Sequence, residues 1–199
     1  MCGLDSSLGR CGRLRSDVVR SPQTLTEVER RVLAAWAADC SERVLDIFEA
    51  EAPDDGRPRA LIDRARAFAR GELNTADAIR HRFTGGVGAA DGVNAAAAAA
   101  ARSAGQAVAV CHMGAHALGA AAYAARAAGL AHPEQPNAVG DEIRWQLDHM
   151  SPEVRCALRG LPRVGENKSG PLGPGLLASG QLGVIIRNVQ AALVDADSG

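Results

Sequence analysis

The sequence is poor in aromatic residues and has no excess of charge of either sign. Its 199 residues include two Trp, one Tyr and three Phe, and the formal net charge is -1. Sheets draw heavily on aromatic and β-branched residues, so this scarcity disfavours a β-rich fold. A nearly neutral chain has no broad positive field to attract phosphates, so we do not expect nucleic acid as a partner.

Long apolar segments and closely paired cysteines are also missing. The apolar stretch at 95–118 is interrupted by Arg102, Gln106 and two histidines, so no membrane span is predicted. The five cysteines are odd in number, widely spaced and without a Cys-x-x-Cys pair, unlike a secreted disulfide framework. The first 22 residues hold no apolar stretch of signal-peptide length. We therefore expect reduced thiols and a cytoplasmic location.

The common enzyme signatures are absent from the sequence. There is no Gly-x-Ser-x-Gly elbow, no dinucleotide-binding glycine fingerprint and no pair of zinc knuckles. The segment around Lys168 is not a phosphate-binding loop, because Asn167 precedes the lysine and Pro162 occupies the first glycine position. The sequence favours a protein without catalytic activity over an enzyme, and it predicts no catalytic residue.

Alanine dominates what is present. It accounts for 40 of the 199 residues, including seven in a row at 95–101. Alanine is the best helix former, and its small side chain lets helices approach closely. The composition predicts an all-α fold, a helical bundle of about six to eight helices.

The first helix has the clearest amphipathic pattern. Thr24 and Thr26 are each followed three residues later by Glu, a capping-box arrangement, and the helix is predicted to continue to about Ala50. Its apolar stripe is expected to contain Val28, Val32, Trp36, Cys40, Val44 and Ile47 or Phe48, with Arg30 among the polar residues of the remainder.

Breaks and periodicity place the other elements. Helices are expected at about 59–70, from Asn74 with Phe83 inward, at 94–128 as one or two helices with Gly105 a candidate break, at 137–149 and at 151–160. A Gly/Pro-rich arm then leads to a final helix whose stripe is Leu182, Ile185, Val189 and Leu193. The predicted organisation is an N-terminal extension at 1–22, a bundle at 23–160, and an arm with its helix at 161–199, packed on the bundle or on a partner.

His112 and His116 are the strongest candidates for chemistry. Four residues apart on a predicted helix, their rings would share one face and could bind a divalent metal such as zinc. The third ligand would have to come from Cys40, Asp39, Glu42 or His81 through tertiary packing. The alternative is a pair of histidines held by hydrogen bonds at the edge of a bundle, and no cofactor is predicted.

Charged residues on the first helix and the following turn form a second candidate site. Asp39, Glu42, Arg43, Arg57 and Arg59 could line a polar pocket against the two histidines. The alternative is an ordinary solvated helix face.

Two segments carry a family resemblance. The pattern consists of Cys-x-Glu-Arg (Cys40, Glu42, Arg43), a turn at Asp55 to Pro58, an Ala-Arg-Ala helix ending in Gly-Glu, and His-x-x-x-His-Ala with Tyr123. Over about residues 25–130 the chain resembles small bacterial helical immunity proteins of the immunity-5-like type. The resemblance implies a non-catalytic protein that binds and neutralises a protein toxin, with Tyr123 among the binding residues.

Two other functions stay open at the level of the sequence. One is a metal- or small-molecule-binding bundle, or an accessory enzyme of this kind, that uses His112 and His116. The other is a homodimer in which the last apolar helix docks on a second copy.

Overall fold

The fold is all-α, as predicted. The computed structural model describes residues 21–81 and 89–195, and within these ranges the chain forms nine α-helices, one short 3-10 helix and no strand. The predicted inward position of Phe83 lies outside the described residues. The helices are α1 (Glu27–Glu42), α2 (Leu45–Glu51), α3 (Arg57–Ala69), α4 (Thr75–His81), α5 (Ala95–Ala109), α6 (His116–Ala131), α7 (Ala138–Asp148), α8 (Pro152–Arg159), η1 (Leu176–Ala178) and α9 (Gly180–Asp195).

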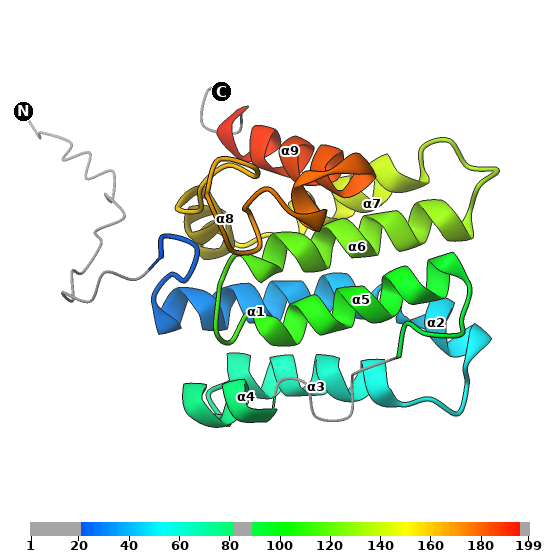
Figure 1. Ribbon diagram of the computed structural model, residues 1–199, viewed down its shortest axis with the longest axis horizontal. Helices are drawn as coiled ribbons and strands as arrows, with labels where there is room; N and C mark the ends of the chain where they lie inside the picture. Colours follow the sequence, from blue (N-terminus) through cyan, green and yellow to red (C-terminus); the bar gives the residue numbers. More distant parts are fainter. Residues whose placement is uncertain (1–20, 82–88, 196–199) are drawn as a thin grey trace, which may run out of the picture.

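The helices stack in successive layers. Figure 1 shows α9 along one edge, α3 and α4 along the opposite edge, and α6, α1 and α5 between them. Helices α5 and α6 pack against each other along their length, α3 packs on α1 and α5, and α9 packs on α6, α7 and α8. The core therefore lies around α1, α5 and α6, which the other helices surround.

The start of α1 is fixed by a capping box, as the sequence predicts. The hydroxyl of Thr26 accepts from the Glu29 amide at 3.3 Å, and the Glu29 carboxylate accepts from the Thr26 amide at 2.7 Å. This exchange satisfies two amides that the first turn of a helix leaves without partners.

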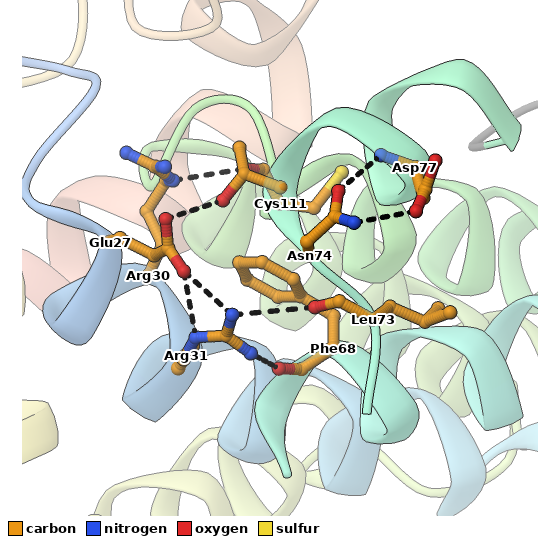
Figure 2. A network of polar contacts seen from close by, with 9 residues as sticks. Glu27, Arg30, Arg31, Phe68, Leu73, Asn74, Asp77 and Cys111 are labelled. Atoms are coloured by element: carbon orange, nitrogen blue, oxygen red, sulfur yellow. Dashed lines mark hydrogen bonds and ion pairs between the residues drawn. The ribbon is translucent and has the colours of Figure 1, made fainter. Parts of the chain in front are cut away.

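The predicted apolar stripe of this helix is wrong at its first turn. Val28 is 72% exposed, whereas Arg30 is buried. The Arg30 side chain donates to the carbonyl of Cys111 at 2.9 Å (Figure 2). It also donates to the carbonyl of Leu25 at 3.0 Å. Backbone carbonyls that lie close only in the fold satisfy a buried guanidinium, which helical periodicity cannot reveal. Further along, Trp36, Cys40, Val44 and Phe48 are buried, as predicted.

A neighbouring arginine joins α1 to the end of α3. Arg31 pairs with Glu27 at 2.6 Å, and its guanidinium lies 4.6 Å from the centre of the Phe68 ring. It also donates to the carbonyls of Phe68 and Leu73, which Figure 2 shows converging on it. One side chain of α1 therefore bonds to the Phe68 carbonyl in the last turn of α3 and to the Leu73 carbonyl in the segment that follows.

Two predicted helices are interrupted. The first ends at Glu42, and α2 starts at Leu45 after Val44 leaves helical geometry (φ -116°, ψ 10°). The helix expected at 94–128 breaks at 110–115, and Gly105 lies within α5. At this break the Gly114 amide donates to the Thr24 carbonyl at 3.1 Å and the Ala115 amide to the Gln23 carbonyl at 3.0 Å. The break therefore depends on backbone bonds to a distant segment.

The α5–α6 contact is made of small residues. Ala104 and Ala107 of α5 and Ala120 and Ala124 of α6 are fully buried. Between them, the Ser103 hydroxyl donates to the Ala120 carbonyl at 2.8 Å and lies 2.7 Å from the Ser41 hydroxyl. Alanine faces let two helix backbones approach closely, so each buried position has little room for a larger side chain.

The C-terminal arm is attached to the start of the bundle by one buried amide. The Gln23 side chain donates to the Ser169 carbonyl at 2.7 Å and accepts from the Leu172 amide at 2.9 Å. Gly170, which has φ +81°, packs against this amide, so a side chain at that position would meet both strain and Gln23. In α9 the predicted stripe of Leu182, Ile185, Val189 and Leu193 is buried.

The expectation of reduced thiols is met at two cysteines. Cys40 and Cys111 are free thiols in the core. Cys2 and Cys11 lie outside the described residues, so the expectation of reduced thiols stays a prediction for the other cysteines. Among the helices of the described residues, none combines the length and the apolar character needed to cross a bilayer.

Candidate functional site

His112 and His116 come together, but not in the predicted way. His112 lies in the turn after α5 and His116 is the first residue of α6, so the two are not on one helix. Their ring centroids are 4.9 Å apart, with the ring planes inclined at 50°. The Nδ1 atom of His116 lies 2.8 Å from Oε1 of Gln106 on α5. The turn, supported by the segment at 23–25, therefore pairs the rings.

A cavity of about 420 Å³ opens beside the two rings. We name it the histidine pocket. Its bundle side is formed by Gln106, His112, Met113, His116 and Tyr123. Its other side comes from the C-terminal arm and η1, at Gly170, Pro171, Gly175, Leu176 and Leu177. The volume lies within the usual range of small-molecule sites.

Gly119 on α6 sets one wall of this pocket. A Cβ at this position would collide with Oε1 of Gln106 and lie 3.0 Å from Cδ1 of Leu177. The missing side chain therefore lets an amide of α5 and a leucine of η1 both approach α6. This close approach also brings Gln106 within reach of His116.

Tyr123 is nine-tenths buried and lines the same pocket. Burial raises the pKa of its hydroxyl, while the positive charges of Arg102 and Arg126 act in the opposite direction. The hydroxyl therefore stays protonated at neutral pH and can donate a hydrogen bond.

The residues considered as a third metal ligand do not join the two histidines. Cys40 is fully buried in the core, and burial together with the nearby Glu142 carboxylate raises the pKa of its thiol. Asp39 and Glu42 both pair with Arg66 on α3, and the side chain of His81 lies outside the described residues. Within residues 21–81 and 89–195 no three His, Cys, Asp or Glu side chains gather as a metal site. The metal at His112 and His116 stays a prediction.

The second candidate set lies elsewhere, on the outer side of α1 to α3. We name it the charged face, and it consists of Asp39, Glu42, Arg43, Arg57 and Arg59. None of these residues lines the histidine pocket. Their side chains are between 41% and 53% exposed. The suggestion that they share a pocket with the histidines is therefore not supported by the geometry.

Ion pairs organise the charged face. Arg57 pairs with Asp55 at 2.5 Å and Arg59 with Glu49 at 2.7 Å. The hydrogen bond from Arg57 lowers the pKa of Asp55. Arg66 on α3 pairs with two carboxylates of α1, with Asp39 at 3.0 Å and also with Glu42. These pairs keep the side chains in defined directions while leaving them accessible.

Arg43 makes the most extensive contacts of this set. It donates to the buried Glu142 carboxylate at 2.7 Å, and its guanidinium lies 4.4 Å from the centre of the Trp145 ring. The ring of His149 also stacks on Trp145, with the two ring centroids 4.0 Å apart. Glu142 also accepts from Gln146 at 3.1 Å.

No pattern in the sequence indicates that Gln106, Arg66 or Glu142 contributes to either site. Each acquires its role from a helix distant in the chain, since Gln106 meets α6, Arg66 meets α1 and Glu142 meets Arg43. Their spacing within their own helices is ordinary. A signal for them would require pairs of positions that change together among relatives.

A known family covers most of the bundle. Residues 23–153 match the family described as Imm-5 like putative immunity protein. The chain belongs to this family. The immunity-family segment contains α1 to α7 and extends beyond the resemblance at about 25–130, so Trp145 lies within it. Helix α9 and the arm follow the segment. No curated protein and no solved structure matches the chain.

Proposed function

We propose that this chain is an immunity-type protein that binds a toxin protein and neutralises it without catalysis. The family match over residues 23–153 carries the proposal. The match includes every residue of the charged face and the Trp145 ring beneath Arg43. The absence of enzyme signatures from the sequence agrees with a binding role.

We assign the toxin contact to the charged face and to Trp145. Arginine and tryptophan are enriched among residues that contribute most to protein interfaces. Arg43 and Trp145 place one residue of each kind together, because the Arg43 guanidinium lies over the Trp145 ring. The Arg43 side chain is 43% exposed. Both signs of charge on this face favour a partner with a complementary pattern, which increases specificity and association rate.

The test is rescue of growth together with complex formation. Products of genes adjacent to this one are expressed singly in a heterologous host, and the one that arrests growth is co-expressed with the chain. We expect growth to resume and the two proteins to co-purify in equal amounts. If no adjacent product is toxic, or if the toxic one is neither bound nor neutralised, the proposal is wrong.

Matched variants locate the surface. Arg43→Ala and Trp145→Ala should each weaken the complex at least tenfold, a loss of about 1.4 kcal/mol or more. Arg144→Ala is the control, because Arg144 lies on the same helix as Trp145 but pairs only with Asp141 at 3.0 Å on an exposed side. Rescue that survives both test variants would place the contact elsewhere.

A further inference from the structure

We propose that α8, α9 and the arm between them form a second interaction surface, which binds an acidic segment of a protein partner through Arg163 and Arg187. This surface lies beyond the immunity-family segment, which ends at residue 153. The proposal therefore does not depend on the toxin contact that we assign to the charged face.

Two adjoining cavities of about 450 and 500 Å³ lie between the arm and α9. They share Arg163, Gln190 and Val194, and we name them together the arm groove. Figure 1 shows α9 along one edge of the molecule, with α8 and the arm beside it. The groove is therefore at the surface, on the opposite side of the bundle from α3 and α4.

The floor of the arm groove is apolar and fixed in place. Leu161 and Leu193 line it and are buried. The Gln190 side chain holds the arm on α9, because it accepts from the Val164 amide at 3.0 Å and donates to the Pro162 carbonyl at 2.9 Å. Since bonds within the chain engage both polar atoms of this amide, the groove is shaped before a partner binds, which lowers the cost of binding.

Two guanidinium groups at this groove have no carboxylate partner. Arg163 and Arg187 both line the second cavity and are exposed. Among the described residues, Arg163 forms no ion pair, and the one recorded bond of the Arg187 side chain is a long one to the Ala178 carbonyl at 3.4 Å. A carboxylate is the acceptor that a guanidinium fork fits best, so one acidic segment in the groove could engage both.

The charge of the sequence is divided at the end of the family match. Residues 23–153 contain 18 acidic and 13 basic side chains, a net charge of -5. Residues 154–195 contain two acidic and five basic ones, a net charge of +3. The arm groove therefore belongs to a basic extension of an acidic bundle. A local patch of this kind attracts acidic segments although the whole chain is nearly neutral.

The lining favours a peptide over a nucleic acid. Glu166 also lines the groove, and its carboxylate would repel a continuous row of phosphates. Val194 is 54% exposed at the groove, above the buried leucines of the floor. An apolar side chain next to the acidic ones of a peptide would cover this surface, which a sugar-phosphate backbone would leave in contact with water.

A second copy of this chain is a poorer occupant than a separate partner. Nine acidic side chains of residues 23–153 already pair with arginines of the same copy. Moving one of them into the groove of another copy would exchange one ion pair for another, with little net gain in free energy. A partner whose carboxylates are not yet paired has no such pair to break.

The test begins with an array of peptides about seven residues long, in which every position is Glu, Gln, Leu or Ser. We expect the chain to retain peptides that contain both Glu and Leu. The strongest binder is then titrated in solution by fluorescence polarisation, beside one match with Gln for every Glu and one with Ser for every Leu. Each match should bind at least about tenfold more weakly, and added salt should weaken the acidic peptide.

Variants place the contact. Arg163→Gln and Arg187→Gln should each reduce the affinity for the acidic peptide about fivefold to tenfold. Both side chains are exposed, so these changes should leave the fold intact. Arg144→Gln on α7 removes the same charge from another exposed position and should leave the affinity unchanged. The proposal is overturned if no peptide is retained, if the Gln match binds equally well, or if affinity is insensitive to both replacements.

Two further measurements address the other occupants. A single-stranded DNA oligonucleotide of similar charge should bind at least about tenfold more weakly than the peptide. Sedimentation velocity should give the same mass for the wild type and for the variant with both replacements. Stronger binding of DNA would assign the groove to nucleic acid, and self-association that the two replacements abolish would assign it to a second copy. Either result would overturn the proposal.

Discussion

Helices α5 and α6 pack through alanine, glycine and serine, whereas the outer side of α1 and α3 is covered by pairs of guanidinium and carboxylate groups. In the first region the side chains are fully buried and short, so the two backbones set the geometry. In the second, partly exposed side chains, between 21% and 53% accessible, are held by charge. Buried close packing tolerates little change, while exposed ion pairs contribute little free energy and are free to be used in recognition.

The largest effect is expected from a bulky residue in the α5–α6 contact. Ala120→Leu should lower the free energy of unfolding by about 2 to 3 kcal/mol, because three carbons must fit where Ala120 is fully buried and its carbonyl accepts from Ser103 of α5. Chemical denaturation monitored by circular dichroism measures this change. Ala60→Leu on the exposed side of α3 is the control and should stay within about 0.5 kcal/mol. Equal losses at both positions would remove the contrast between the regions.

A smaller loss is expected from the polar link inside the same contact. Ser103→Ala removes a donor to the Ala120 carbonyl and a contact with the Ser41 hydroxyl, and should cost about 1 to 2 kcal/mol. The double variant with Ser41→Ala should cost less than the sum of the two single changes, because both remove the same hydroxyl contact. Denaturation of the four proteins gives this coupling, and strict additivity would show that the two hydroxyls act independently.

On the charged face, Arg66→Gln should lower the free energy of unfolding by about 0.5 to 1 kcal/mol. The hydrogen bond from Arg66 lowers the pKa of Glu42 below its ordinary value of 4.5. A lowered carboxyl pKa in the folded state adds stability above the unfolded pKa, and this stability is lost as pH falls through the folded pKa. The difference between the wild type and the variant should therefore be full at neutral pH and shrink below pH 4.5.

Salt separates this prediction from a packing effect. The Arg66→Gln difference should also decrease at high ionic strength, because screening weakens exposed charge pairs. A difference that is independent of both pH and salt would show that the aliphatic part of Arg66, not its charge, stabilises the fold.

The smallest effect is expected at the Arg70–Glu72 pair, where both side chains are more than half exposed. Arg70→Gln should leave the free energy of unfolding unchanged within the error of the measurement, because solvent screens a fully exposed ion pair. The same denaturation experiment tests this expectation. A loss as large as that of Arg66→Gln would mean that exposure does not rank the ion pairs of this protein.

How far the sequence predicts a feature of this molecule depends on whether that feature is local to one helix. Alanine content and helical spacing are sufficient to predict the all-α fold and the buried stripe of α9, and the Thr-x-x-Glu pattern predicts the capping box at Thr26. Each of these features depends on neighbours within one helix. The break at 110–115 and the burial of Arg30 depend on backbone groups from distant segments. No local pattern contains that information.

The candidate sites divide in the same way. His112 and His116 were found by their spacing, yet a turn and not a helix brings them together. The charged residues of α1 were found as a set, but their partner Arg66 was missed because α3 supplies it. Tyr123, named only through the family resemblance, proved to line the histidine pocket.

Gln23 is the first residue of the immunity-family segment. Both polar atoms of its side-chain amide nevertheless form hydrogen bonds to residues beyond the end of that segment, Ser169 and Leu172. A truncated protein ending at residue 153 would retain the whole family match and lose Ser169 and Leu172. The Gln23 amide would then be without these two partners, and the surface of α6 that α9 covers would be exposed to solvent. We expect such a fragment to aggregate when expressed alone. We therefore expect the unit that folds to be larger than the segment that similarity outlines.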